Sequence, residues 1–248
     1  MSDEDPLAPY LLAGRVAPAV DRVFTAAMRA SRDRGGIELG KRYGGPAAIG
    51  FLIDFRTRLA APYGVVSGAG FAAVTRYADP AECQRVLDKQ LAHGMIHRVD
   101  GGFAATTRGH AFLQELYQLH AGVTAEIWSG HAERVARLVE ALGRLLAAAA
   151  TDGGDAFHAM APPHEPDGTP PGVLLLNRLG SLRYHRADAH AAAWQAAGHT
   201  ARSITALAPG PEREAIEAET DRRAAGPYEV LPPAQRLTFL ADLAALPG

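Results

Sequence analysis

Cysteine is almost absent from this chain, with Cys83 the only one among 248 residues. A single thiol excludes an intramolecular disulfide and a zinc site built from several cysteines. Long apolar runs are missing too, because no window approaches the roughly 18 apolar residues of a transmembrane helix. The first ten residues, MSDEDPLAPY, are acidic and lack the basic start and apolar centre of a secretory signal. These absences predict a cytoplasmic protein with no membrane partner and no bound metal.

Neither sign of charge dominates. The chain has 25 Lys and Arg against 27 Asp and Glu, which gives a formal net charge of −2. This balance predicts neither a general nucleic-acid binder nor a polyanion, although a dimeric repressor with a local basic face can be near neutral overall. The length allows one large domain or two small ones, either with a well-buried core.

Residues 79–116 carry the most informative pattern in the chain. Pro80 suits the first turn of a helix, and the apolar stripe that follows ends at Gly94. Residues 100–102, Asp-Gly-Gly, favour a tight hairpin between two short strands. Thr107 can cap the next helix, which has an apolar face. The order predicts the recognition helix, the wing and the following helix of a winged helix-turn-helix domain.

The same parts resemble the MarR family of bacterial winged-helix regulators over roughly residues 46–121. The family pattern is an apolar helix, a Gly-Leu or Gly-Met turn, an Asp-Gly wing and a Thr-x-x-Gly helix start. The matching residues are Leu87, Leu91, Gly94, Met95, Asp100, Gly101, Thr106 and Gly109. The resemblance implies a DNA-binding transcriptional regulator that responds to a small ligand. Its DNA contacts would come from Gln84, Arg85 and Lys89 in the major groove and from Arg98 in the wing.

The local charge leaves a second interpretation open. Between residues 56 and 110 there are seven Arg and Lys against four Asp and Glu, whereas a DNA-binding face normally has a clearer basic surplus. Glu82 and Asp88 lie on the predicted recognition helix and would face phosphate unfavourably unless they are paired. The alternative is a winged-helix fold kept as a scaffold for dimerisation or ligand binding.

Helical periodicity dominates the rest of the chain, so the predicted fold class is mainly α, with a small β-hairpin wing. The predicted organisation is a winged-helix domain with flanking helices over 1–150, a linker over 151–172 and a C-terminal helical domain over 173–248. Amphipathic helices are expected at 17–33 and 123–150. Their apolar stripes predict a homodimer interface, with packing inside the chain as the alternative.

Ionisable residues crowd the start of the C-terminal region. This part resembles a set of poorly characterised actinobacterial proteins with a His-Arg-Gly-Asp-x-His-like helix followed by a Glu-x-x-Thr-Asp-Arg stretch. The matching residues are His185, Arg186, Asp188 and His190, then Glu217, Thr220, Asp221 and Arg222, with Ala187 in place of the glycine. The resemblance implies no activity. It does suggest that the two stretches belong to one site.

Helix geometry argues against a metal site here. His185 and His190 lie about 140° apart around a helix, too far to bind one ion together. Arg186, His190 and Trp194 share a face that could bind an anionic or aromatic ligand, while a structural polar network is the alternative. The predicted ligand-binding residues are Tyr184, His185, Arg186, Asp188, His190, Trp194, Glu217 and Asp221.

An enzymatic function has little support in the sequence. Ser181 lacks the Gly-x-Ser-x-Gly motif of a nucleophile elbow, and Cys83 has no identifiable catalytic partner. A reaction would depend on His185 or His190 as general base, with Arg186 holding an anion. The sequence therefore favours a DNA-binding regulator without a cofactor. The alternative is a small-molecule-binding protein or enzyme on a winged-helix scaffold.

Overall fold

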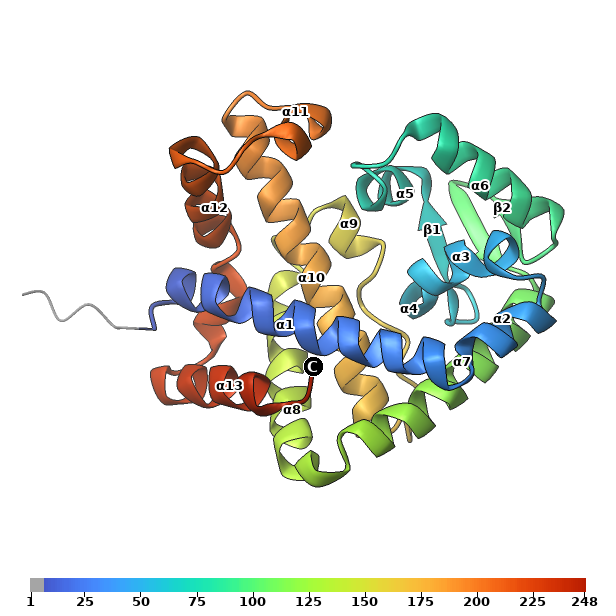
Figure 1. The fold of residues 1–248 in the computed structure, drawn as a ribbon, viewed down its shortest axis with the longest axis horizontal. Coiled ribbons are helices and arrows are strands. Elements are labelled where there is room, and N and C mark those ends of the chain that lie inside the picture. Colours follow the sequence, from blue (N-terminus) through green and yellow to red (C-terminus); the bar gives the residue numbers. More distant parts are fainter. Residues whose placement is uncertain (1–6) are drawn as a thin grey trace, which may run out of the picture.

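The computed structural model describes residues 7–248 and confirms a mainly helical protein with one small antiparallel sheet (Figure 1). Among these residues, no helix combines the length and the apolar character needed to cross a membrane. The helices are α1 (Pro9–Ser31), η1 (Arg32–Gly36), α2 (Ile37–Arg42), α3 (Pro46–Asp54), α4 (Arg56–Leu59), α5 (Gly68–Val74), α6 (Pro80–Ala92), α7 (Thr107–Ile127), η2 (Ser129–His131), α8 (Ala132–Ala149), α9 (Asp155–His158), α10 (Pro171–Ala196), α11 (Ala201–Ala206), α12 (Pro211–Arg223), η3 (Gly226–Val230) and α13 (Pro233–Ala245). The strands are β1 (Val65–Ser67), β2 (Ile96–Val99) and β3 (Gly102–Ala105).

The sheet has the order β1-β3-β2, with both neighbouring pairs antiparallel. The hairpin between β2 and β3 forms where the sequence predicted it, and Gly101 there has a φ of 77°. Asp79 caps α6 by accepting a hydrogen bond from the Glu82 amide. At the start of α7 the capping residue is Thr106, which accepts from the Gly109 amide. The prediction that Thr107 is the cap was wrong by one residue, because Thr107 is already the first residue of the helix.

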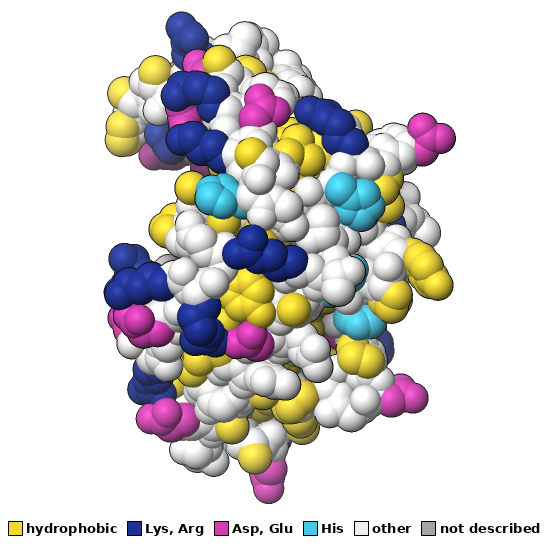
Figure 2. All heavy atoms as spheres, turned by 90° about the vertical axis from the view of Figure 1, so that its right-hand side faces the viewer, with side chains coloured by type: hydrophobic (Ala, Val, Ile, Leu, Met, Phe, Trp, Pro, Cys, Tyr) yellow, Lys and Arg dark blue, Asp and Glu magenta, His cyan; other side chains and the backbone are white. Residues whose placement is uncertain are grey.

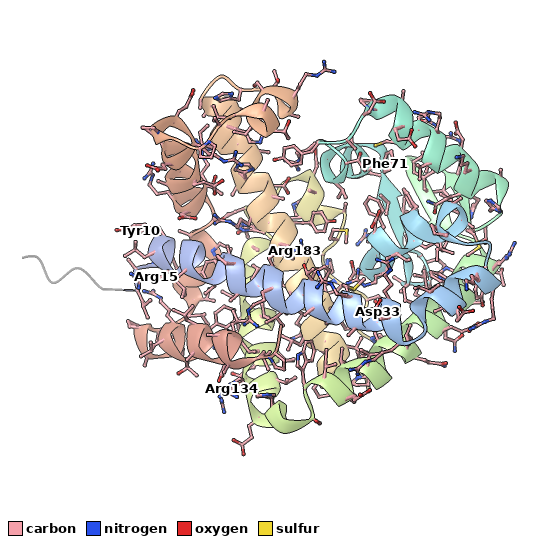
Figure 3. The ribbon with its side chains drawn as sticks, in the orientation of Figure 1. Tyr10, Arg15, Asp33, Phe71, Arg134 and Arg183 are labelled. Atoms are coloured by element: carbon pink, nitrogen blue, oxygen red, sulfur yellow. The ribbon has the colours of Figure 1, made fainter. Side chains whose placement is uncertain are left out.

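One apolar core holds α2 to α7 around the sheet. Its centre is aromatic: neighbouring rings among Phe51, Phe55, Phe71 and Phe103 have centroids 4.6 to 6.3 Å apart, and Figure 3 shows Phe71 on α5. Fully buried Gln90 on α6 accepts a hydrogen bond of 2.9 Å from the Phe51 amide on α3. This hydrogen bond and the burial of Leu87 of α6 in the same core fix α6 against α3, so the opposite side of α6 faces outwards.

A second core joins α1, α8, α10 and α13. Leu12, Val16 and Val20 of α1 pack in the same cluster as Leu138 and Leu142 of α8. The apolar stripes that predicted a homodimer are therefore covered within one chain. Packing inside the chain was the alternative interpretation of these stripes in the sequence.

The second core also crosses the boundaries expected from the sequence. It unites α1 with the C-terminal helices, although these were assigned to separate domains. Residues of the expected linker are buried as well, including Phe157 and Met160. The Met160 carbonyl accepts hydrogen bonds from Thr57 (3.0 Å) on the first core's side and Ser181 (3.1 Å) on α10. This segment is thus a packed layer that binds the two cores together.

Candidate functional site

The long helix α10 carries most of the predicted ligand-binding residues, and it runs through the centre of the molecule (Figure 1). Pro171 is at the first turn, where a missing amide proton costs nothing. Over its 26 residues the helix buries side chains all around its circumference, including polar Asn177, Ser181 and His185. Buried polar groups need hydrogen-bond partners, so the contacts of α10 decide what each of its polar residues can do.

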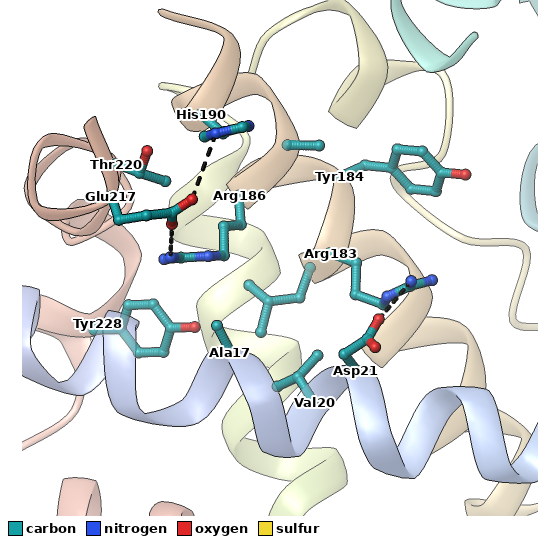
Figure 4. Close-up of a pocket in the computed structure, with 12 residues that line it drawn as sticks. Ala17, Val20, Asp21, Arg183, Tyr184, Arg186, His190, Glu217, Thr220 and Tyr228 are labelled. Carbon is teal, nitrogen blue, oxygen red and sulfur yellow. Dashed lines mark hydrogen bonds and ion pairs between the residues drawn. The ribbon is translucent and has the colours of Figure 1, made fainter. Parts of the chain in front are cut away.

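A cavity of about 390 Å³ opens beside α10, between this helix, α1, α12 and η3 (Figure 4). Arg186 and His190 project into it from successive turns, and Glu217 reaches them from α12. One Glu217 carboxylate oxygen lies 3.4 Å from Arg186 Nη2, and the other lies 3.6 Å from His190 Nε2. Arg186 Nη1 lies 2.7 Å from Asp221 Oδ1. The structure thus brings together the two stretches that the sequence assigned to one site.

Gly14 on α1 gives Asp221 the room to reach Arg186. A Cβ atom at this position would clash with the Asp221 carboxylate. The packing of α1 on α12 and the ion pair at the cavity therefore depend on each other.

The charges at this cavity favour a cationic or neutral ligand. Arg186 is shared by two carboxylates, and Arg183 pairs with Asp21 of α1 at 2.6 Å, which gives two guanidiniums against three carboxylates. Arg183 lies beside α1 in Figure 3. The sequence predicted an anionic or aromatic ligand for the face of Arg186, and an anion there has to compete with carboxylates that already pair with this guanidinium.

Burial makes His190 a neutral group. It lowers the pKa of His190, and the nearby Arg186 acts in the same direction, while Glu217 opposes them. The ring therefore offers one hydrogen-bond donor and one acceptor near neutral pH. Tyr228 lines the same cavity, and its pKa is raised by burial. The cavity is thus lined by hydrogen-bonding groups around a slight excess of negative charge.

Asp188 lies on the other side of α10 and has a different task. It pairs with Arg76, in the segment between α5 and α6, and accepts a hydrogen bond of 2.8 Å from the Phe157 amide at the start of α9. A Cβ atom on Gly154 would lie 2.8 Å from Asp188 Cγ, so only glycine leaves this carboxylate its space. Asp188 therefore links α10 to the segment between α5 and α6 and to α9.

His185, Tyr184 and Trp194 are also placed by packing. His185 is 4% exposed and meets the Phe157 ring edge-on, with centroids 5.7 Å apart. Tyr184 lines the cavity, whereas Trp194 is buried with Ile204 and Ile216 in a small cluster at the end of α10. Of the predicted stripe of Arg186, His190 and Trp194, the first two face the cavity and the third holds α11 and α12 to α10.

Tyr77 is a residue of this site that sequence reasoning missed. It follows α5, and its hydroxyl accepts a hydrogen bond of 3.1 Å from Trp194 Nε1 and lies 3.1 Å from His190 Nδ1. His190 therefore touches Glu217 with one ring nitrogen and Tyr77 with the other. No spacing rule connects residues 113 positions apart, and the only hint was an aromatic residue in the turn before α6.

The four predicted DNA-binding residues are all exposed, and three of them have partners within the chain. Gln84 donates a hydrogen bond of 2.7 Å to Asp88, Arg85 pairs with Glu82, and Arg98 lies 3.8 Å from Asp88. The Lys89 side chain has no hydrogen bond or ion pair with another described residue. Figure 2 shows this side of the molecule with basic and acidic side chains intermixed.

The described residues hold no group of three or more His, Cys, Asp or Glu side chains arranged to bind a metal ion. Comparisons of the chain with protein-family models, with curated proteins and with solved structures give no match.

Proposed function

We propose that this chain is a winged helix-turn-helix protein of MarR-like type, which binds double-stranded DNA through α6 and responds to a small ligand. The supporting observation is the order of elements in the first core: α3 and α4, β1, α5, α6, the β2–β3 hairpin, then α7. In such a domain the second helix of the α5–α6 pair enters the major groove and the hairpin touches the backbone. The outward side of α6 carries Gln84, Arg85 and Lys89, which are exposed in the described part of the chain.

In this proposal, ligand binding in the cavity beside α10 is coupled to the position of α6 on DNA. His190 contacts Glu217 inside the cavity and Tyr77 in the segment that leads into α6. Arg76, one residue earlier, is tied to Asp188 of α10. A ligand that competes for Glu217 changes the partner of His190 and with it the contact to Tyr77. Because coupling requires different affinities for two arrangements, the ligand would favour one position of α6 over another.

The charge balance around the cavity indicates a ligand with a cationic or neutral polar group, which Glu217 would bind. A small-molecule-binding protein or an enzyme that does not bind DNA is the second candidate. It is favoured by the pairing of Arg85 with Glu82 and the approach of Arg98 to Asp88, which reduce the charge available to phosphate. In an enzyme, neutral His190 would serve as general base.

Replacing both Arg85 and Lys89 by Ala is expected to weaken binding to a specific duplex. Each lost base contact costs about 1 to 3 kcal/mol, so the loss is roughly tenfold or more. The measurement is fluorescence anisotropy with duplex from upstream of the gene and a scrambled duplex, at salt concentrations of about 50 to 200 mM. A matched control removes two charges from α12 with Arg222→Ala and Arg223→Ala, far from α6 in Figure 1. Equal affinity for both duplexes in the unaltered protein would favour the second candidate.

Homodimer formation belongs to the regulator proposal, because a two-fold symmetric operator requires a two-fold protein. Since α1 and α8 are covered within the chain, the dimer has to use another surface. Light scattering of the protein with its duplex is expected to give two chains per duplex. One chain per duplex would remove the two-fold operator from the proposal and leave DNA binding by α6 standing.

A further inference from the structure

A second cavity, larger and far more apolar, lies between α1, η1, α2, α3 and α7, and has a volume of about 660 Å³. Most of its wall is apolar, including Met28, Ile37, Leu39, Ile49, Ile53 and Leu119. Its charged lining residues are Arg29, Arg32 and Lys41, of which Lys41 is paired with Glu38, and no Asp or Glu of the described chain lines it. The wall therefore suits an apolar body, and the charges around it favour an anion.

His120 lines this cavity from the middle of α7. It is 0% exposed, and neither ring nitrogen has a hydrogen-bond partner among the described residues. Burial lowers its pKa to about 3, and the positive charge of Arg56 adds to the effect. The ring is therefore neutral, with one N–H to donate and one nitrogen to accept. Buried polar groups are rarely left without partners, so a polar atom of a ligand is the natural complement to His120.

Arg56 is a buried cation behind the same wall. It is 3% exposed, and its Nε and Nη2 have no hydrogen-bond partner among the described residues. Its Nη1 donates to the carbonyl of Ile53, which lines the cavity, at 3.2 Å. Because the charge of Arg56 is felt at His120, a negative charge placed beside His120 would be stabilised by it.

We propose that this cavity binds an aliphatic monocarboxylate, such as a medium-chain fatty acid, with the carboxylate at His120 and the hydrocarbon chain along the wall of α1, α2, α3 and α7. The His120 N–H donates to the carboxylate, and Arg56 supplies the balancing charge from behind. A neutral alcohol of the same length contacts the same wall and brings no negative charge to His120 and Arg56. A small polar acid also places a negative charge beside His120, but it makes few apolar contacts with the wall of the cavity. The site shares no lining residue with the cavity beside α10, and it does not depend on DNA binding.

Octanoate and 1-octanol are a matched pair of probes, titrated into the full chain by isothermal calorimetry. Octanoate is expected to bind one site per chain at least tenfold more tightly than 1-octanol. His120→Phe keeps an aromatic ring of similar size without nitrogens, so it should remove most of this preference and leave 1-octanol binding unchanged. Leu119→Trp fills the cavity from α7 and should weaken both probes. His158→Phe makes the same change at an exposed position on α9 and should alter neither.

Equal affinity for the two probes, or no saturable octanoate binding, would overturn the proposal. An octanoate preference that survives in folded His120→Phe would also overturn it, because the head group would then lie elsewhere. Circular dichroism of each variant reports folding. If His120→Phe does not fold, Leu119→Trp decides the matter, since octanoate binding that persists with the cavity filled places the ligand outside it.

Discussion

At pH 4 the protein is expected to be about 3 kcal/mol less stable than at pH 7 through His120 alone. Its pKa is about 3 in the folded protein and 6.5 in an exposed imidazole. Below pH 6.5 the unfolded chain therefore binds a proton that the folded chain excludes. Stability falls by about 1.4 kcal/mol for each pH unit, and the loss is complete near pH 3. Above pH 6.5 both states are neutral at this position and the effect vanishes.

Urea unfolding at several pH values between 7 and 4 measures this loss. Other groups contribute in acid, among them Asp242: burial opposes its charge, but hydrogen bonds from Arg137 and Arg134 outweigh burial and lower its pKa. His120→Phe is the control, because it removes the imidazole and keeps those carboxylates. The free energy of unfolding of the variant should fall less steeply with pH, and the difference between the two curves isolates His120. Parallel curves would show that the pKa of His120 is not lowered in the folded protein.

Features that depend on a few neighbouring residues could be predicted from the sequence. The Asp-Gly-Gly hairpin and the end of a helix at Gly94 follow from backbone conformations that glycine allows, with φ values of 77° at Gly101 and 67° at Gly94. The helix start near Thr106 was found to within one residue, because two adjacent threonines carry the same signal. Each rule works because cause and effect lie within one turn of the chain.

Contacts between segments that are distant in the sequence are harder to predict, because periodicity shows that a face is buried without showing which segment covers it. The stripes of α1 and α8 suited a dimer as well as an intrachain core, and the structure has the core. For the same reason the roles of Tyr77 and Gly14 could not be predicted, because they depend on helices that are distant in the sequence. Arg186 and Asp221 are an informative exception, since the resemblance of their two stretches to those of other proteins, rather than spacing, indicated that they belong to one site.

The charge of a candidate site also depends on partners. Arg186 and His190 alone suggest a site for an anion, which was one of the two ligand classes, anionic or aromatic, that the sequence predicted. With Glu217 and Asp221 in place the cavity has an excess of negative charge, and with burial His190 is neutral. Conversely, Arg56 and His120 showed no pattern in the sequence, because side-chain nitrogens that are buried without a hydrogen-bond acceptor become visible only in the folded chain.

Asp188→Ala is expected to destabilise the protein by about 3 kcal/mol, because it leaves buried partners unpaired at two places. Arg76 loses its ion-pair partner, with side chains 15% and 14% exposed, and the Phe157 amide loses its acceptor. Asp188→Asn keeps an oxygen for the amide and should cost less. Asp21→Ala is the matched control, since its pair with Arg183 is much more exposed (59% and 34%) and should contribute about 1 kcal/mol at most.

A double-mutant cycle of Asp188→Ala with Arg76→Ala separates the ion pair from the amide bond, because only the first is shared by both variants. Arg76 and Tyr77 lead into α6, so loosening them should also change DNA binding if α10 controls the position of α6. We expect Asp188→Ala to weaken specific duplex binding under conditions where the protein is still folded. Loss of stability with unchanged DNA affinity would make Asp188 a purely structural tie, and the link from the α10 cavity to DNA would then have to pass through Tyr77 alone.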